Sequence, residues 1–241
     1  MAATNRNMII ASTSTLFGQK PLEYLLPELE PIFREKQISE LLFIPFARPG
    51  GLTHDEYTDR IRNALKSLNV NVKGIHEFEN QRSAIEDAEA IFTGGGNTFL
   101  LVKALHDHDL MQTLRNAIYS GTFYLGTSAG SNICGLNMMN TNDMPVVYPS
   151  SFKTTGAISY NINAHYQDPV KNDQHMGETR EQRIKEFHTH NSIPVLGLRE
   201  GSYIRVTEGT ELLKGAHTAR LFRQNEVPEE LKPNTDLSTI N

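Results

Sequence analysis

The sequence predicts a single α/β domain of three layers (αβα), in which helices cover both faces of a mostly parallel sheet. Over residues 1–135, short apolar runs alternate with stretches whose apolar residues recur at helical spacing. Such alternation indicates successive β-α units, which form parallel sheets. Two of the apolar runs end in glycine-rich turns, at residues 94–96 and 126–130. Turns at the carboxyl ends of parallel strands are where folds of this class bind ligands.

Length and composition limit the class of protein. The chain has 241 residues, which suits one large domain, here residues 1–241, better than two small ones. Its formal net charge is -5 and it has no basic block, so we expect no nucleic-acid partner. No apolar run approaches the roughly 20 residues that span a bilayer, and the polar N-terminus does not resemble a signal peptide. We therefore expect a cytoplasmic protein with no membrane partner.

The strands expected in the first half are short and continuously apolar, as in parallel strands that are buried on both faces. They cover residues 8–12, 41–46, 70–75, 90–93 and 122–125.

The helices expected between these strands are marked by residues that favour helix starts. These markers are Pro21 before residues 22–33, a capping box of Thr53 and Glu56, a second capping box of Ser83 and Glu86, Asn97 before residues 98–105, and Asp109 before residues 110–119.

The second half of the chain is less regular. Short strands, some of them antiparallel, are expected at residues 159–164, 195–198, 202–206, 211–213 and 219–222, and a helix at residues 179–188. Residues 168–177 are polar and lack periodic apolar positions, which predicts a mobile loop near a site. Residues 226–241 are expected to form a loosely ordered tail.

The most informative stretch is Gly-Thr-Ser-Ala-Gly at residues 126–130, between an apolar strand and a helix. This is the pattern of a nucleophile elbow, whose sharp turn leaves no room for side chains at the two glycines. The turn would present the Ser128 hydroxyl at the start of a helix. There the Ala129 N–H has no helical partner and can face a developing oxyanion. The same pattern also occurs in phosphate-binding turns and in tightly packed turns.

A nucleophilic serine needs a base, and the base needs an acid to orient it. Of the nine histidines, His165 is favoured because it ends an apolar strand that follows the elbow in sequence. Most of the others fit solvated or capping positions. Asp143 and Glu200 compete for the role of the acid, and each is also explained as an ordinary turn residue. The glycines at residues 94–96 can supply a second oxyanion N–H.

Cys134 is the only cysteine, so neither an internal disulfide nor a cysteine metal site is expected. We expect it to be a buried residue, with a thiol nucleophile as the minor alternative. No histidine and carboxylate residues have metal-binding spacing such as H-E-x-x-H, so we predict a site without metal or other cofactor.

Several motifs occur in a fixed order along the chain. They are GGGNTF at residues 94–99, GTSAGSN at 126–132, TNDMP at 141–145, NAH at 163–165 and GETREQR at 177–183. Together they closely resemble peptidase E, the α-aspartyl dipeptidase family of serine peptidases (family S51), over about residues 9–222. The resemblance implies a fold similar to class I glutamine amidotransferases (flavodoxin-like). It also implies hydrolysis of Asp-Xaa dipeptides, which are small-molecule substrates.

The resemblance also implies roles for particular residues. These are Ser128 as nucleophile, His165 as general base, Asp143 or Glu200 as the third member, the N–H groups of Ala129 and of Gly95 or Gly96 as the oxyanion hole, and Arg180 and Asn97 as substrate-binding residues. One departure is Thr127, where some members carry tryptophan, which alters a wall of the pocket and leaves the chemistry unchanged.

A physical argument supports Arg180 as the residue that reads the substrate aspartate. A carboxylate left unpaired in a closed pocket costs several kcal/mol, and a guanidinium can bind it through two parallel hydrogen bonds. In the first turn of a helix, moreover, a cation opposes the helix dipole. The alternatives are a cyanophycinase-like or β-aspartyl peptide hydrolase and, from another class, a non-catalytic amidotransferase-like binding module. We expect a monomer or a homodimer.

Overall fold

In the computed structural model, which describes residues 5–169 and 177–240, the strands form one seven-stranded and one four-stranded sheet. The strands of the larger sheet, in spatial order, are β3 (Asn71–Gly74), β2 (Glu40–Ile44), β4 (Ala90–Thr93), β5 (Phe123–Thr127), β1 (Asn7–Ala11), β8 (Ser202–Thr207) and β9 (Thr210–Gly215). The strands from β3 to β1 are parallel, whereas β8 and β9 are antiparallel. The predicted α/β fold class is confirmed, and the strands of the first half lie within two residues of their predicted bounds.

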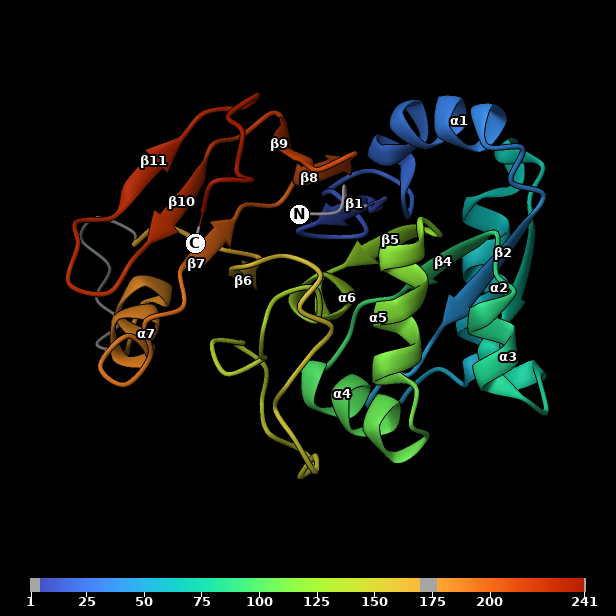
Figure 1. The fold of residues 1–241 in the computed structure, drawn as a ribbon, viewed down its shortest axis with the longest axis horizontal. Coiled ribbons are helices and arrows are strands. Elements are labelled where there is room, and N and C mark those ends of the chain that lie inside the picture. The colour runs from blue at the N-terminus through green and yellow to red at the C-terminus, as the bar shows by residue number, and fades with distance from the viewer. Residues whose placement is uncertain (1–4, 170–176, 241) are drawn as a thin grey trace.

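Helices cover both faces of the larger sheet, as the three-layer prediction requires (Figure 1). They are α1 (Leu26–Glu35), α2 (His54–Ala64), α3 (Gln81–Glu86), α4 (Thr98–Asp107), α5 (Met111–Ser120) and the short α6 (Ala129–Asn132). A further helix, α7 (Arg180–Phe187), packs instead against the second sheet described below. Single 3₁₀ turns lie at η1 (Glu23–Leu25), η2 (Lys66–Leu68) and η3 (Ile75–Glu77).

Alternate residues of each central strand enter two separate hydrophobic clusters. In β1, Ile9 packs in the cluster formed with α1 and α2, whereas Ile10 packs in the cluster formed with α3, α4 and α5. Both side chains are fully buried. This burial on two faces explains why the strands read as continuous apolar runs in the sequence.

Two of the predicted helix starts have the expected geometry. The capping box of Thr53 and Glu56 is present at the start of α2, with both reciprocal hydrogen bonds formed. The Asn97 side chain accepts from the Leu100 N–H and caps α4.

Three of the predicted helix starts are wrong. The α1 helix begins at Leu26, not near Pro21, because Leu22 has a left-handed backbone with φ 62°. At α3, the Asn80 side chain is the cap and accepts the Ser83 N–H, so Ser83 lies inside the helix. At α5, Asp109 has φ 55° and no side-chain cap is formed, so the helix starts at Met111. For α1 and α5, a residue with a left-handed backbone precedes the helix, whereas at α3 a different residue provides the cap.

The second sheet was not predicted, although most of its strands were. Its order is β11 (Glu229–Leu231), β10 (Ala219–Phe222), β7 (Val195–Leu198) and β6 (Asn161–Ala164). Strands β6 and β7 are parallel, and the remaining pairs are antiparallel. Figure 1 shows this sheet and α7 on the left, beside the β8–β9 end of the larger sheet.

The C-terminal segment differs from the expectation of a loosely ordered tail. Residues 226–240 include strand β11 and bury Leu231, Leu237 and Ile240 in the main hydrophobic cluster. The Leu237 N–H donates to the Glu211 carbonyl oxygen at 2.7 Å, which fixes the segment against β9. Polar residues around these three apolar side chains hide the anchoring in the sequence.

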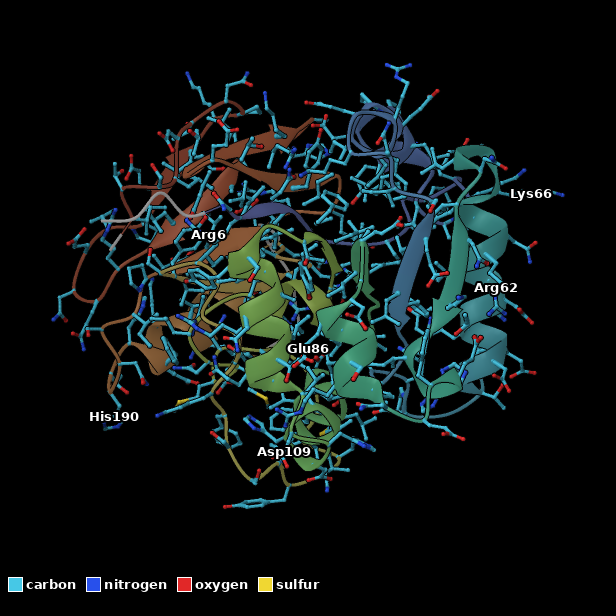
Figure 2. All side chains as sticks on the ribbon, turned by 45° about the vertical axis from the view of Figure 1, so that its right-hand side comes forward. Arg6, Arg62, Lys66, Glu86, Asp109 and His190 are labelled. Atoms are coloured by element: carbon cyan, nitrogen blue, oxygen red, sulfur yellow. The ribbon has the colours of Figure 1, made fainter. Side chains whose placement is uncertain are left out.

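Arg62 fixes the edge strand of the larger sheet. At the outer edge in Figure 2, it donates to the Val72 carbonyl oxygen at 2.7 Å and to Glu77 at 2.6 Å, and thereby ties α2 to the edge strand β3.

Within residues 5–169 and 177–240, no helix is long and apolar enough to cross a membrane. Of the loop predicted at residues 168–177, residues 170–176 lie outside the described part of the chain.

Candidate active site

The strand-to-helix turn at Ser128 has the geometry of a nucleophile elbow. Ser128 follows β5 and precedes α6 with φ 54° and ψ -113°, a conformation that costs roughly 1–3 kcal/mol for a residue with a side chain. A Cβ on Gly126 would lie 2.5 Å from the Gly130 carbonyl oxygen. A Cβ on Gly130 would lie 2.1 Å from the Thr93 carbonyl oxygen. The close approach expected of the two glycines is therefore confirmed.

His165 lies between Ser128 and Glu200. Its Nε2 is 2.8 Å from Ser128 Oγ, and its Nδ1 is 2.6 Å from Glu200 Oε1. With the ring proton on Nδ1, that nitrogen donates to Glu200, and Nε2 is left to accept the serine proton. The arrangement has the form of a Ser-His-Glu triad.

Two parallel strands bring the base and the acid together. His165 follows β6 and Glu200 lies in the turn after β7, and these strands pair with Ala164 opposite Leu198. Both side chains therefore leave the same edge of the second sheet. The His165 side chain is 34% exposed and that of Glu200 is 49% exposed, so the pair is open to solvent and to substrate.

Asp143 does not contact the base. Its Oδ2 accepts the Thr98 N–H at 2.7 Å and the Thr141 hydroxyl at 3.2 Å, at the N-terminus of α4. The helix dipole favours a carboxylate at that position. Of the two acids that the sequence leaves in competition, Glu200 is the one next to His165.

The glycine turn after β4 faces the nucleophile. A Cβ on Gly95 would lie 2.9 Å from Ser128 Cβ, so this glycine borders the serine directly. Within the described residues, the N–H groups of Gly95, Gly96 and Ala129 have no hydrogen-bond partner. These N–H groups are the donors that the sequence predicts for an oxyanion hole.

Tyr57 is a residue of the site that sequence reasoning missed. Its hydroxyl donates to the Gly95 carbonyl oxygen at 3.2 Å. Burial raises the pKa of the Tyr57 phenol, so it remains a donor at neutral pH. In the sequence, Tyr57 lies among the apolar residues of a predicted helix, which indicates only a role in the core. Its hydroxyl contact could not be predicted, because the Gly95 turn is about 40 residues further along the chain.

Arg180 is the first residue of α7 and is half-buried. Burial lowers the pKa of the guanidinium, as does the nearby Arg183, whereas Asp143 partly offsets both effects. Among the described residues, Arg180 has no carboxylate within ion-pair distance. The positive charge is therefore poorly compensated, as expected of a group that receives an anionic ligand.

Asn97 has a different use from the one the resemblance implies. Its Oδ1 accepts the Leu100 N–H at 3.2 Å, and its Nδ2 donates to the Met144 carbonyl oxygen at 2.7 Å. Both polar ends of the side chain are engaged within the protein. Asn97 thus holds the loop that contains Asp143 against the start of α4.

Cys134 is fully buried behind the elbow, where its thiol donates to the Gly130 carbonyl oxygen at 3.4 Å. Burial raises the pKa of this thiol well above its ordinary value. A reactive cysteine needs a lowered pKa, so Cys134 has the properties of a packing residue.

Comparisons with known proteins show which sequences resemble this chain. The model of Peptidase family S51 matches residues 8–213. A probable alpha-aspartyl dipeptidase of Drosophila melanogaster is 40% identical over 239 residues, covering 99% of this chain and 98% of that protein. Peptidase E of Streptomyces coelicolor is 41% identical over 234 residues, covering 97% of this chain and 94% of that protein.

Two solved structures share the fold at low sequence identity. The crystal structure of a peptidase from an acI-B1 actinobacterium has a TM-score of 0.70 at 15% identity and covers 96% of each chain. That of a putative peptidase E from Listeria monocytogenes EGD-e has a TM-score of 0.56 at 19% identity, covering 94% of this chain and 99% of the other.

Proposed function

The chain belongs to peptidase family S51, and from this we propose that it hydrolyses Asp-Xaa dipeptides with Ser128, His165 and Glu200 as its catalytic triad. Family membership makes the protein a hydrolase, a serine-type dipeptidase. The observation that carries the proposal is the pair of hydrogen bonds that joins Ser128 through His165 to Glu200, at 2.8 and 2.6 Å.

In the acylation step, Ser128 Oγ attacks the carbonyl carbon of the aspartyl residue while His165 Nε2 takes the hydroxyl proton. The negative charge that develops on the carbonyl oxygen is stabilised by the Ala129 N–H and by an N–H of Gly95 or Gly96. Glu200 stabilises the imidazolium that forms. His165 then gives its proton to the leaving nitrogen, the peptide C–N bond breaks, and the second residue departs as an amine.

In the deacylation step, water attacks the aspartyl ester of Ser128. His165 takes a proton from the water and returns it to the serine oxygen as the ester bond breaks. Free aspartate leaves and the enzyme is restored.

Arg180 and Asp143 are the residues we assign to recognition of the N-terminal aspartate. The undercompensated guanidinium of Arg180 suits the side-chain carboxylate of the substrate. Asp143 Oδ1 has no partner among the described residues, and the group lies beside α4, directly after the oxyanion turn. We assign the α-ammonium group of the substrate to this carboxylate.

The setting of the reaction also belongs to the proposal. The lone, buried Cys134 is compatible with a reducing compartment, so a cytoplasmic location is proposed, with a monomer or homodimer as the active form. Cell fractionation and light scattering test these two statements.

A panel of dipeptides with and without N-terminal aspartate tests the proposed substrate. Asp-Leu should be cleaved and Ala-Leu, Asn-Leu and β-Asp-Leu should not. Preferential cleavage of β-Asp-Leu would replace the proposal with the β-aspartyl alternative.

Substitution of Ser128 tests the proposed mechanism. Ser128→Ala should lower kcat by about 10⁴-fold or more, because the covalent route is lost. The fold should stay intact, and a fluorophosphonate probe should label the parent protein but not this variant. Ser67→Ala, at an exposed serine, is the matched control and should retain full activity. Turnover retained by Ser128→Ala would exclude the serine mechanism.

A further inference from the structure

The proposed triad is assembled from both sheets. Ser128 follows β5 of the larger sheet, whereas His165 and Glu200 follow β6 and β7 of the smaller one. A relay with bonds of 2.6 and 2.8 Å requires the two sheets to be fixed relative to each other. One contact is direct, from the Ala164 N–H in β6 to Asn132 Oδ1 in α6 at 3.3 Å. The others at this point involve Ala11 and Ser12, at the carboxyl end of β1.

Ala11 holds the elbow. Its carbonyl oxygen accepts the Ser128 N–H at 3.2 Å and the Ser131 hydroxyl at 2.6 Å. The residue that precedes Ser12 therefore contacts the backbone of the nucleophile itself.

Ser12 holds the base through its side chain. Its hydroxyl oxygen accepts the His165 N–H at 2.9 Å, and the hydroxyl donates to the Leu198 carbonyl oxygen at 2.6 Å. Ser12 is fully buried, so water does not compete for either bond. One hydroxyl group thus joins the end of β1 to the ends of both β6 and β7.

Ser12 also contacts the turn that carries the acid. Its N–H donates to the Ser202 carbonyl oxygen at 3.1 Å, and the Ser202 N–H donates to the Arg199 carbonyl oxygen at 3.0 Å. Glu200 lies within that closed turn, two residues after Leu198. The same serine therefore bounds the Glu200 turn from both sides.

The backbone of the base has an unusual conformation. His165 has φ 54°, a left-handed conformation that side-chain-bearing residues adopt only when the surroundings enforce it. The hydrogen bond from the His165 N–H to Ser12 Oγ acts directly on this peptide unit. The neighbouring N–H groups of Ala164 and Tyr166 donate to Asn132 Oδ1 and to the Leu198 carbonyl oxygen, so the bond to Ser12 is the one that acts on the His165 peptide itself.

We infer that Ser12 is a positioning residue for catalysis, whose hydroxyl holds His165 and the Glu200 turn in register with Ser128. The inference rests on the triad proposed above. Ser12 does not touch the reacting atoms, and it acts only through the geometry of the base and the acid. A side chain placed about 1 Å from its productive position can cost a hundredfold in rate, so loss of this one hydroxyl should be visible in turnover.

Ser12→Ala tests the inference. The variant should fold, with KM for Asp-Leu changed by less than about threefold and kcat lowered by about 10- to 100-fold. Thr155→Val is the matched control, because it also removes a buried hydroxyl that donates to a backbone carbonyl, that of Ile133 at 2.7 Å, and Thr155 makes no hydrogen bond to Ser128, His165 or Glu200. An equal kcat in both variants would overturn the inference.

Conservative variants separate the hydroxyl from the volume of the side chain. Ser12→Thr keeps the donor and the acceptor and should recover most of the lost kcat. If the added methyl group prevents folding, Ser12→Cys takes its place, and its weak thiol donor should give a kcat between those of the parent and Ser12→Ala. A kcat for Ser12→Cys no higher than that for Ser12→Ala would count against the hydroxyl.

A His165→Ala background separates positioning from general loosening of the site. Once the imidazole is gone there is no base to position, so adding Ser12→Ala should lower the residual rate on a chromogenic aspartyl anilide by less than about twofold. The same 10- to 100-fold loss in this background would overturn the inference. If the parent protein is not labelled at Ser128 by a fluorophosphonate, the proposed mechanism fails first, and the two failures are thereby distinguished.

Discussion

Glu200 and Asp143 are both acidic turn residues in sequence, but they have different surroundings in the fold. The carboxylate of Glu200 lies 2.6 Å from His165 Nδ1, whereas that of Asp143 accepts the first N–H of α4 at 2.7 Å. The acid beside the base is expected to affect the chemical step. The acid at the helix start is expected to affect binding of the substrate next to that helix. The two positions lead to different kinetic expectations.

Glu200→Gln should lower kcat by about 10²- to 10⁴-fold with KM little changed, because a neutral amide no longer stabilises the imidazolium. Asp143→Asn should act mainly on KM for Asp-Leu, since it weakens the bond to the substrate ammonium group. Steady-state kinetics of the two variants, measured side by side, gives the comparison. A fall in kcat for Asp143→Asn larger than that for Glu200→Gln would reverse the assignment.

Arg180 allows a second comparison at the residue scale. Arg180→Ala should lower kcat/KM for Asp-Leu by about 10²-fold or more, because the substrate carboxylate loses a charged partner in a half-buried site. Arg183→Ala, one turn further along α7 with a side chain that is 52% exposed, should change it by less than about threefold. If both variants lose activity equally, Arg180 is not the specificity residue.

At the scale of elements, the elbow depends on two backbones that approach each other too closely for a side chain. The Gly130 position lies against the carbonyl oxygen of Thr93, an atom that is held in the middle of the sheet. A methyl group at this position can be accommodated only if α6, which contains Gly130, moves away from the end of β4. The elbow therefore couples the nucleophile to the packing of the strand beside it.

Gly130→Ala should lower the free energy of unfolding by about 3 kcal/mol and abolish activity, because the new Cβ would lie 2.1 Å from the Thr93 carbonyl oxygen. Gly209→Ala is the control. Gly209 has a positive φ, of 88°, and a Cβ there would meet nothing within 4 Å, so about 1 kcal/mol of backbone strain and no steric clash is expected. Urea unfolding measures both values, and equal losses would contradict the steric argument.

Elements with strong local signals could be predicted from the sequence, and those set by distant contacts could not. The Thr53 capping box and the Asn97 cap depend on neighbours three residues away, and both are present. The predicted start of α5 is wrong because Asp109 adopts a left-handed backbone that its residue type permits but does not require.

For the whole molecule, the second sheet marks the limit of prediction from sequence. Its strands are visible as short apolar runs, but their separation from the larger sheet depends on which runs pair. Ser12 Oγ accepts the His165 N–H and donates to the Leu198 carbonyl oxygen, and both hydrogen bonds join residues more than 150 positions apart. No local pattern encodes such contacts, so Ser12 reads in the sequence only as the last residue of a predicted strand.

The C-terminal segment provides the test at the scale of the molecule. Leu237 is fully buried in the main cluster, so Leu237→Ala should lower the free energy of unfolding by about 2–5 kcal/mol. Val227→Ala, in the same segment with Val227 90% exposed, should change it by less than about 0.5 kcal/mol. Thermal or urea unfolding distinguishes an anchored segment from a loose one, and similar values for both variants would indicate a loose one.

The position of β1 has a consequence for the order in which the molecule is made. This strand leaves the ribosome early, yet it pairs with β5 on one side and with β8 on the other. The nascent chain thus contains Ser128, and later His165, before β7, Glu200 and β8 have been synthesised. Pairings between such distant segments also form late in folding. Dipeptide hydrolysis should therefore begin only after residues 195–207 have emerged from the ribosome. Shorter nascent chains should be inactive.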